Sequence, residues 1–244
     1  MPEPNDFADL AAFHTLGNQP IPAAVLALTP NASPELVWRN ELGGLTFRVG
    51  ERFVKWNPKE SGIDVRLERD RLGWISDRHP APRVVLFGED SHEQWLVTEA
   101  LDGEHAVGDE WRRRTPEAVA AIATGLRALH AVPVSGFPDA WIADSWANRR
   151  PAGLGPAPAI DHPVVVHGDA CAPNTQISRE GAWTGNTDFG DLTIGDRWAD
   201  LAIASMSLDW NFGEGHQGAF FEAYGIEPDP ERIAYYRALW DLES

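Results

Sequence analysis

The chain has 244 residues, of which 37 are acidic and 20 are basic, so its formal net charge is −17. Binding to a nucleic-acid backbone requires clustered cations, so this balance argues against a nucleic-acid partner. The composition, 43% hydrophobic and 23% charged, is that of a globular protein with a sizeable core. A single cysteine excludes an internal disulfide framework and a zinc site made of several thiolates.

Neither the N-terminal residues nor the most apolar window predicts export or membrane insertion. The chain starts with an acidic, proline-containing stretch, whereas a secretory signal combines a basic start with an apolar core. The longest apolar window, residues 118–132, contains Arg127 and His130 and is too short to span a bilayer. We therefore expect a cytoplasmic protein without a membrane partner.

Residues 35–98 have the pattern of a small β-rich lobe. Short runs rich in apolar and β-branched residues, bounded by turn residues, predict strands at 36–39, 45–49, 52–56, 84–87 and 95–97. The first three follow one another closely enough to pair as antiparallel neighbours. Apolar residues among charges predict a helix over 64–76, before the last two strands.

The pattern changes to helices after residues 99–103, which we predict as a connecting segment. Thr115 is expected to cap a long helix with one apolar face, and Asp229 to cap the last helix. A proline- and glycine-rich stretch leads into a predicted strand at 164–166. We therefore predict an α+β fold with two lobes, a small antiparallel β-lobe at 1–98 and a larger, mainly helical lobe at 104–244.

Residues that can carry chemistry follow the predicted strand at 164–166. Asp169 precedes Asn174 by five residues, and Asp188 opens an Asp-Phe-Gly turn fourteen residues further on. This combination is typical of phosphoryl transfer. Asp169 would orient the attacking hydroxyl, and Asn174 and Asp188 would supply oxygen ligands to Mg²⁺.

The β-rich lobe contains a matching set of residues for nucleotide phosphates. Lys55, one of only two lysines in the chain, lies in the third predicted strand, and Glu68 on the following helix can pair with it. The Gly43-Gly44 turn between the first two strands lets the backbone approach phosphate oxygens.

These motifs resemble the aminoglycoside phosphotransferase family, which shares the two-lobed fold of protein kinases. The resemblance runs from about Leu36 to Trp240 and is most specific in the segment from His167 to Ala202. Leu96–Gly103 is similar to the family's hinge, whose backbone pairs with adenine, and Asp64–Ile75 resembles the helix that carries the glutamate partner of the lysine. The amino-acid sequence around Cys171 looks closest to that of the 3′ and 3″ O-phosphotransferases.

The resemblance implies an enzyme that transfers the γ-phosphoryl group of ATP, or GTP, with Mg²⁺, to a hydroxyl of an aminoglycoside antibiotic and so inactivates the antibiotic. The nucleotide contacts that it implies are Lys55, Glu68, Gly43, Gly44, Thr46, Glu99 and Leu101. The residues leave the identity of the acceptor hydroxyl and the oligomeric state open.

The distribution of charge points to a cationic acceptor. Residues 99–244 carry a net charge of −13, against −4 for residues 1–98. A negative field of this kind attracts a polycationic aminosugar. The acidic residues that we expect to face the acceptor are Asp139, Asp144, Glu214 and Asp241.

Two alternatives stay open, and a departure from the family pattern is the motivation for the second of them. Asp191 stands where the 3′ enzymes commonly carry arginine, which removes a cation near the transferring phosphoryl group. The alternatives are a kinase of another small alcohol and a nucleotide-binding protein with little catalysis.

Several neighbouring residues have structural interpretations that we prefer. We expect Cys171 to be a small packing residue, His167 to bond backbone near the catalytic loop, and Asp200 to brace that loop. Trp141, Trp146 and Trp210 are expected in the core rather than against a sugar.

Overall fold

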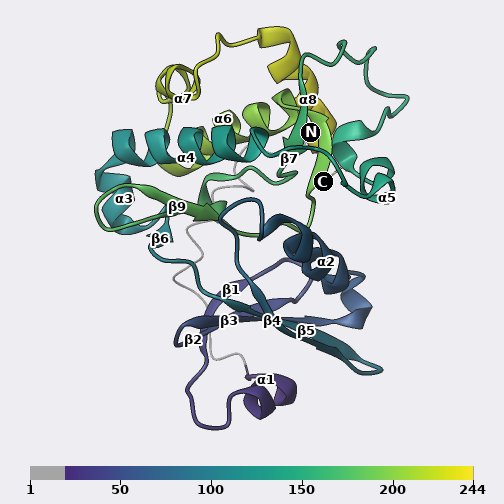
Figure 1. Ribbon diagram of the computed structural model, residues 1–244, viewed down its shortest axis with the longest axis vertical. Helices are drawn as coiled ribbons and strands as arrows, with labels where there is room; N and C mark the ends of the chain where they lie inside the picture. Colours follow the sequence, from purple (N-terminus) through teal and green to yellow (C-terminus); the bar gives the residue numbers. More distant parts are fainter. Residues whose placement is uncertain (1–19, 244) are drawn as a thin grey trace. The chain divides into compact units, whose positions relative to one another are not determined.

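The computed structural model describes residues 20–243, which form two compact units (Figure 1). Within the described residues, the sheet unit comprises those up to Gly73 and Pro82–Ala100, and the helical unit comprises Trp74–Ala81 and those from Leu101 on. Residues 1–19, which include the acidic start of the chain and belong to the predicted β-rich lobe, lie outside the described residues. The sheet unit ends inside segment 99–103, the predicted connection.

The sheet unit is built on five antiparallel strands in the order β1-β2-β3-β5-β4. The strands are β1 (Glu35–Arg39), β2 (Leu45–Val49), β3 (Arg52–Pro58), β4 (Val84–Glu89) and β5 (Glu93–Glu99). The helical segments are α1 (Ala23–Leu28), the 3₁₀ turn η2 (Lys59–Ser61) and α2 (Val65–Ile75), whose last residues belong to the helical unit. All five predicted strands and the predicted helix are confirmed, and α1 is an addition.

The alternation of side chains along β3 separates its lysine from the apolar core of the sheet unit. Val54 belongs to the apolar cluster that includes Val25 of α1. The next residue, Lys55, therefore points to the opposite face of the sheet. In register, Lys55 pairs with Thr46 on β2 and with Leu96 on β5.

The helical unit contains the remaining elements. Its helices are α3 (Asp109–Arg113), α4 (Thr115–His130), α5 (Asp139–Ala143), α6 (Trp198–Phe212), α7 (Gln217–Tyr224) and α8 (Pro230–Glu243), with 3₁₀ turns η3 (Trp146–Asn148) and η4 (Ala172–Asn174). Its strands are β6 (Glu104–His105), β7 (Pro163–Val166), β8 (Thr175–Ile177), β9 (Trp183–Asn186) and β10 (Thr193–Asp196). They form a two-stranded sheet, β10-β7, and a three-stranded sheet, β6-β8-β9.

Helix α6 runs through the core of the helical unit. It packs against α8, while α4 packs against α7 (Figure 1). Most residues of α6 are buried, around the whole circumference of the helix. A helix of this kind has no polar stripe, so the spacing of apolar residues gives no amphipathic signal for it.

The start of α4 differs from the prediction. Arg114, not Thr115, occupies the N-cap position, and Thr115 is the first helical residue. The Thr115 hydroxyl donates a hydrogen bond to the carbonyl oxygen of Arg112 at 3.0 Å. The short helix α3 ends immediately before α4, so the hydroxyl satisfies a carbonyl of α3 instead of capping α4. Asp229 does cap α8, because its Oδ1 accepts the N–H of Arg232 at 3.1 Å.

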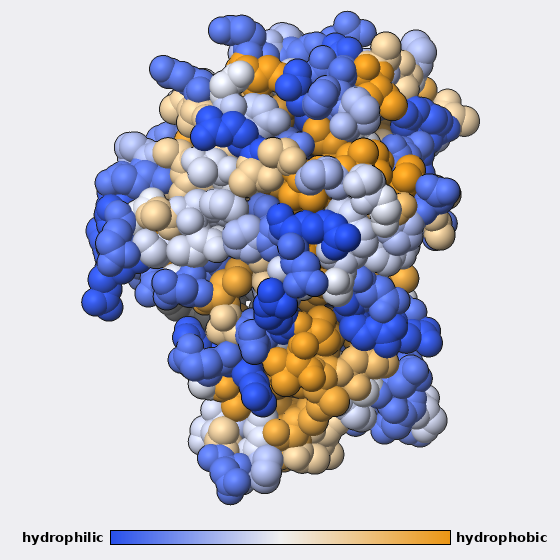
Figure 2. All heavy atoms as spheres, in the orientation of Figure 1, coloured by the Kyte–Doolittle hydropathy of each residue, from blue (hydrophilic) through white to orange (hydrophobic). Residues whose placement is uncertain are grey.

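The surfaces of the two units differ on the face drawn in Figure 2. Apolar side chains gather most densely over the sheet unit there, whereas hydrophilic side chains cover much of the helical unit. Among the described helices, none combines the length and the apolar character needed to cross a membrane.

Candidate active site

The loop that follows β7 is held by one buried aspartate. Asp200, in the first turn of α6, accepts the N–H of His167 at 2.7 Å and the N–H of Gly168 at 3.1 Å. Gly168 has a φ of +84°, and a Cβ at this position would lie 2.3 Å from the carbonyl oxygen of Asp191. Only glycine fits both the backbone angle and the space. The predicted bracing role of Asp200 is confirmed by these contacts.

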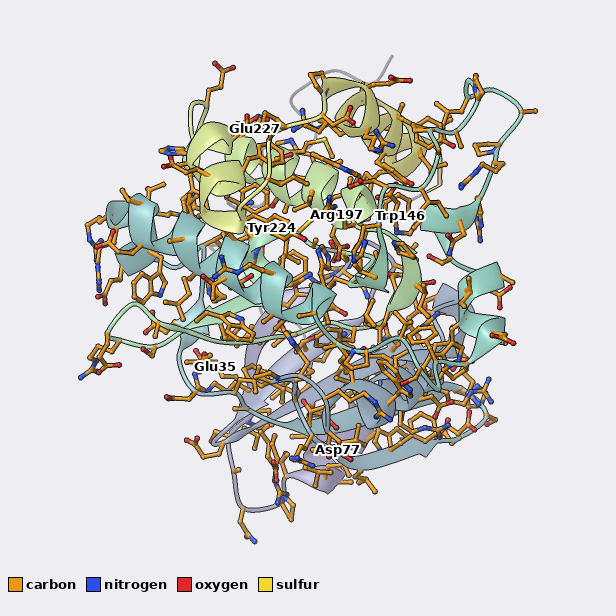
Figure 3. All side chains as sticks on the ribbon, turned by 45° about the horizontal axis from the view of Figure 1, so that its top comes forward. Glu35, Asp77, Trp146, Arg197, Tyr224 and Glu227 are labelled. Carbon is orange, nitrogen blue, oxygen red and sulfur yellow. The ribbon has the colours of Figure 1, made fainter. Side chains whose placement is uncertain are left out.

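Asp200 is itself held by a histidine and a tyrosine from two other helices. The Nε2 atom of His130 lies 3.0 Å from Oδ2 of Asp200, and its Nδ1 lies 2.8 Å from the hydroxyl of Tyr224, which Figure 3 labels. A carboxylate only accepts hydrogen bonds, so Nε2 of His130 is the donor in its contact with Asp200. This chain of hydrogen bonds links α4 and α7 to the loop.

His167 bonds backbone on both sides of the site, as predicted. Its Nε2 donates to the carbonyl oxygen of Thr187 at 2.9 Å, and its Nδ1 accepts the N–H of Asp169 at 3.3 Å. Its ring also packs against the fully buried ring of Phe189 at 4.7 Å between centroids. His167 therefore ties the loop after β7 to the segment after β9.

The hairpin of β8 and β9 brings the two predicted metal ligands together. Thr175 pairs with Asn186 in the antiparallel register. The residues just outside this pair are therefore neighbours, and the N–H of Thr187 donates to the carbonyl oxygen of Asn174 at 2.9 Å. Asp188 is the next residue along the chain after Thr187. The backbones of Asn174 and Asp188 are therefore close together at the open end of the hairpin, although the hairpin separates them in sequence.

The side chains of Asp169 and Asn174 are in direct contact. The Nδ2 atom of Asn174 donates to Oδ2 of Asp169 at 3.0 Å and to its carbonyl oxygen at 2.9 Å. Because the amide nitrogen is engaged in this way, Oδ1 of Asn174 is the atom that can accept a cation. Burial, followed by the charge of Asp188, raises the pKa of Asp169 above its usual value.

Cys171 packs against the main apolar cluster of the helical unit, as predicted, and its thiol also lies among polar groups. Its thiol donates a hydrogen bond to the carboxylate of Asp169, and the hydroxyl of Ser207 on α6 donates to its sulfur. Burial raises the pKa of this thiol well above its usual value, so it stays protonated. The carboxylate of Asp169 thus receives hydrogen bonds from both Asn174 and Cys171.

Asp188 has an unusual backbone conformation. Its φ is +63°, and among residues 20–243 it is the one non-glycine residue with positive φ. Such a conformation costs free energy and persists where the surrounding structure imposes it, often at functional sites.

The side chains of Asn174 and Asp188 suit Mg²⁺ better than a metal ion that is coordinated entirely by protein side chains. Within the described part of the chain, no group of three His, Cys, Asp or Glu side chains could hold a metal ion. Mg²⁺ takes few protein oxygens and completes its shell with water and phosphate. One amide oxygen and one carboxylate fit that requirement.

A buried pair that sequence reasoning missed supports the same hairpin. Oδ1 of Asn186 accepts from Nε2 of His79 at 3.0 Å and from Nε1 of Trp183 at 3.1 Å. Burial lowers the pKa of His79 to about 4. Because His79 is remote from Asn186 in sequence and carries no motif, only the fold reveals the contact.

In the sheet unit, the predicted lysine and glutamate form an ion pair. Nζ of Lys55 lies 2.6 Å from Oε2 of Glu68, with side-chain exposures of 26% and 11%. Lys55 stands on the middle strand of the sheet and Glu68 in the first turn of α2. The pair is partly shielded from water, and the lysine retains access to solvent.

The two glycines of the β1–β2 turn have different surroundings. Gly43 has a φ of +87° and open space around it. The N–H of Gly44 donates to Oδ1 of Asn40 at 2.6 Å, and a Cβ there would lie 1.9 Å from Oδ1 of Asn57. Gly44 is therefore required by the packing of the two asparagines.

The backbone of the predicted connecting segment is partly engaged within the sheet unit. The N–H groups of Glu99 and Ala100 donate to the carbonyl oxygens of Arg83 and Glu51, both at 2.9 Å. The carbonyl group of Glu99 is therefore the more suitable of its two backbone groups for a ligand.

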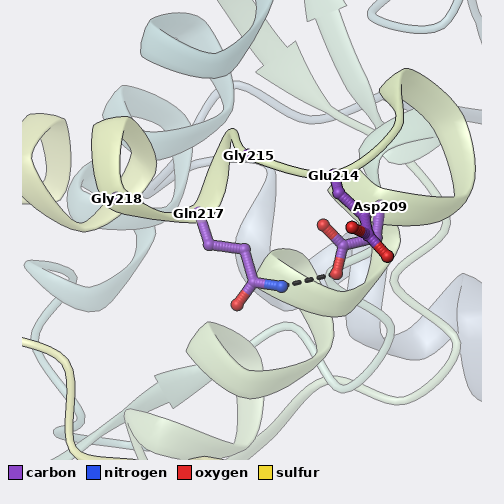
Figure 4. Close-up of a pocket in the computed structure, with 5 residues that line it drawn as sticks. All are labelled: Asp209, Glu214, Gly215, Gln217 and Gly218. Atoms are coloured by element: carbon purple, nitrogen blue, oxygen red, sulfur yellow. Dashed lines mark hydrogen bonds between the residues drawn. The ribbon is translucent and has the colours of Figure 1, made fainter.

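The four acidic residues predicted to face the acceptor fall in two places. Asp139 and Asp144 stand at the two ends of α5, and Asp241 is next to Trp240 of α8, whose ring packs edge-on against Trp146 at 5.1 Å. Glu214 instead lines a pocket of about 450 Å³ with Asp209 at the end of α6, beside Gln217, which donates to Asp209 (Figure 4).

Known proteins resemble this chain over most of its length. The model of the phosphotransferase enzyme family matches residues 36–236. An aminoglycoside 3′-phosphotransferase of Streptomyces fradiae is 36% identical over 220 residues, which cover 75% of this chain and 81% of the relative. A streptomycin 3″-kinase of Streptomyces griseus is 31% identical over 246 residues, with coverages of 83% and 89%.

A solved structure shares the fold over almost its whole length. The aminoglycoside phosphotransferase APH(3″)-Id of Streptomyces rimosus, in complex with ADP and streptomycin, matches with a TM-score of 0.69 and 25% identity, covering 97% of this chain and 99% of that one. The protein described here belongs to the phosphotransferase enzyme family and, within it, to the aminoglycoside phosphotransferases.

Proposed function

We propose that this enzyme transfers the γ-phosphoryl group of ATP to a hydroxyl of an aminoglycoside. The observation that carries the proposal is the hydrogen bond from Nδ2 of Asn174 to Oδ2 of Asp169, which leaves the amide oxygen available to a cation near this carboxylate. The relatives named for aminoglycoside and streptomycin phosphorylation support the same reaction. Such an enzyme needs ATP, so we place it in the cytoplasm.

In the helical unit, each functional side chain has one role. ATP supplies the phosphoryl group, and Mg²⁺ neutralises the charge on its phosphate oxygens. Asp169 accepts a hydrogen bond from the acceptor hydroxyl and takes its proton as the new oxygen–phosphorus bond forms and the bond between the γ-phosphorus and the leaving ADP oxygen breaks. Asn174, through Oδ1, and Asp188, through its carboxylate, hold the cation.

In the sheet unit, the ammonium group of Lys55 binds phosphate oxygens, and Glu68 keeps it directed. Thr46 stands beside Lys55 on the next strand, and Gly43 allows the β1–β2 turn to approach a phosphate. We assign the adenine contacts to the backbone of Glu99 and Leu101.

On the acceptor side, Asp144 and Asp241 are better placed than Glu214. Both are within two residues of the Trp146–Trp240 contact, and Nε1 of Trp146 donates to the carbonyl oxygen of Gly168, next to Asp169. The exposed side chain of Asp191, whose backbone packs against Gly168, adds a further negative charge near the base. These carboxylates favour an acceptor that carries ammonium groups.

A panel of acceptors in a coupled ADP-release assay tests the proposal. We expect ATP-dependent turnover with kanamycin A or streptomycin, and none with glucose or choline. The acceptor KM should rise steeply with ionic strength, because exposed charges are screened within about 8 Å at physiological salt. Asp169→Asn should lower kcat by at least 100-fold, roughly the contribution of a general base, while ATP binding is retained.

Three results would contradict the proposal. Turnover with choline or glucose alone would indicate a kinase of another alcohol. ATP binding without acceptor-dependent ADP release from any compound would indicate a nucleotide-binding protein. An Asp169→Asn variant with nearly full activity would show that the assigned base is wrong.

A further inference from the structure

Trp146 makes a buried hydrogen bond to the peptide that leads into the catalytic aspartate. Its side chain lies in η3, is 7% exposed, and belongs to the main apolar cluster of the helical unit (Figure 3). Its Nε1–H donates to the carbonyl oxygen of Gly168 at 2.7 Å. A buried indole N–H group needs a hydrogen-bond acceptor. The burial of Trp146 therefore explains why its N–H has an acceptor, but it does not explain why that acceptor is the carbonyl oxygen of Gly168.

The hydrogen bond from Trp146 to Gly168 holds the peptide group that directly precedes Asp169. Asp200 accepts the N–H groups of His167 and Gly168, and so fixes the peptides on the N-terminal side of Gly168. The peptide between Gly168 and Asp169 is held at its carbonyl by Trp146 and at its N–H by a longer bond of 3.3 Å to His167. Rotation of this peptide would turn the Cα–Cβ bond of Asp169, and glycine at 168 would permit it.

Trp146 is also held by contacts outside the catalytic loop. Asn148 donates through Nδ2 to the carbonyl oxygens of Ile142 and Ile194, at 3.0 Å and 2.9 Å, and so ties η3 to α5 and β10. The ring of Trp146 packs edge-on against Trp240 of α8, with an interplanar angle of 86°. The indole therefore cannot follow the peptide if that peptide rotates.

We propose that Trp146 is a positioning residue that sets the direction of the Asp169 carboxylate toward the acceptor hydroxyl. The inference rests on the proposed function, in which Asp169 is the base. Trp146 is also the point where the segments carrying Asp144 and Asp241 meet the catalytic loop, through its own chain and through Trp240. An acceptor bound by these acids would thus be aligned with the base by the same side chain.

The test compares Trp146→Phe with a matched control, Trp198→Phe. Trp198 is 2% exposed, belongs to the same apolar cluster, and donates through Nε1 to Oδ2 of Asp161 at 3.1 Å rather than to the catalytic loop. Both substitutions keep an aromatic ring, remove the same atoms and delete one indole N–H bond, which is buried at Trp146 and partly buried at Trp198. Loss of packing should therefore affect both variants alike.

We expect Trp146→Phe to lower kcat about tenfold, a barrier increase of about 1.4 kcal/mol, with KM values for ATP and acceptor within about twofold of the wild type. Trp198→Phe should keep kcat near the wild-type value. Amide hydrogen exchange in residues 167–174 should be faster in Trp146→Phe than in Trp198→Phe, and this readout does not depend on the identity of the acceptor.

The failures can be told apart. If the wild type phosphorylates no acceptor, the proposed function is wrong, and exchange in the loop still tests the contact. If Trp146→Phe matches the wild type in kcat and in exchange, or if both variants lose activity equally, Trp146 has no positioning role.

Discussion

The two units hold their functional side chains in different ways. In the sheet unit, Lys55 is directed by its ion pair with the buried Glu68, and the lysine side chain itself remains partly exposed. In the helical unit, Asp169 stands on a loop whose backbone and side chain are bonded to α6, η3 and η4. The attraction between an ammonium and a phosphate falls off slowly with distance, whereas a hydroxyl-to-carboxylate bond needs a defined direction. The chemistry of each group therefore explains how firmly it is held.

This difference can be tested by comparing activity with stability. Changes in the network around Asp169 should lower both, because the same hydrogen bonds support the core of the helical unit. Changes to the lysine pair should lower activity and affect stability much less.

The largest effect is expected from Asp200→Asn. The amide keeps the shape of the carboxylate, but it presents N–H groups where His130 and two backbone N–H groups all donate. Donors left unpaired in the core should cost about 3 kcal/mol, a fall in Tm of roughly 6–12 °C for a chain of this size. We also expect kcat to fall together with Tm, measured by thermal unfolding and ADP release.

The conservative variant Asp200→Glu distinguishes charge from position. It restores the acceptor oxygens but moves them by one methylene, so Tm should recover in part while kcat stays low. A stable and fully active Asp200→Asn enzyme would show that the loop is not held by this residue.

A pH-dependent loss of stability is expected from His79. Its folded pKa, about 4, lies below the value of 6.5 that it has when unfolded. Between these values the unfolded chain binds more protons, so stability is lost as the pH falls from about 6.5 to 4, by up to ~3 kcal/mol. Urea unfolding at a series of pH values measures the loss.

The matched variant is His79→Gln, which can still donate to Asn186 but does not titrate in this range. Because burial also lowers the pKa of His105, the relevant quantity is the difference between the two proteins and not the slope of either. Parallel curves for wild type and variant would mean that His79 titrates normally in the folded protein.

A smaller effect, mainly on activity, is expected from Glu68→Gln. Loss of the charge removes the ion pair that directs the ammonium group of Lys55, so kcat/KM for ATP should fall about tenfold, equivalent to ~1.4 kcal/mol. Stability should change by about 1 kcal/mol, because the ammonium group that loses its partner stands on a partly exposed side chain and can be hydrated. Steady-state kinetics and thermal unfolding give both numbers.

The second lysine of the chain provides the control. Lys59 pairs with Glu89 at 2.8 Å in the same unit, and the two side chains are 37% and 34% exposed. Glu89→Gln removes an equivalent charge and should leave kcat/KM unchanged. If the two variants behave alike, the loss in Glu68→Gln is not due to the lysine.

The sequence predicts the parts of this fold whose pattern is local. The alternation in β2 and β3 and the cap at Asp229 each depend on a few adjacent residues, and the structure agrees with them. Helix α6 has no such signal because it is buried on all sides. The short strands β8 and β9 contain polar residues and glycine, so their pairing depends on the hairpin as a whole.

The same distinction applies to the site. Asp169, Asn174 and Asp188 could be proposed from their spacing, because the chemistry needs those residue types in that order. The partners His79, His130 and Trp146 could not, since each reaches the site from a distant segment through one hydrogen bond. Spacing identifies the residues that react, and only the fold identifies those that hold them.

The smallest effect is expected at Cys171, whose thiol lies among polar groups in addition to its packing role. Its thiol donates to Asp169, but a thiol is a weak donor, and Asn174 donates to the same carboxylate. We therefore expect Cys171→Ala to lower kcat only about threefold, the effect of a hydrogen bond worth less than 1 kcal/mol. Cys171→Ser retains a donor held by Ser207 and should restore activity. If the alanine and serine variants are equally active, the thiol does not help to direct the carboxylate, and Asn174 alone does so. Asp169 would then be held by fewer side-chain hydrogen bonds, and the contrast with Lys55, which is held by one ion pair, would be smaller.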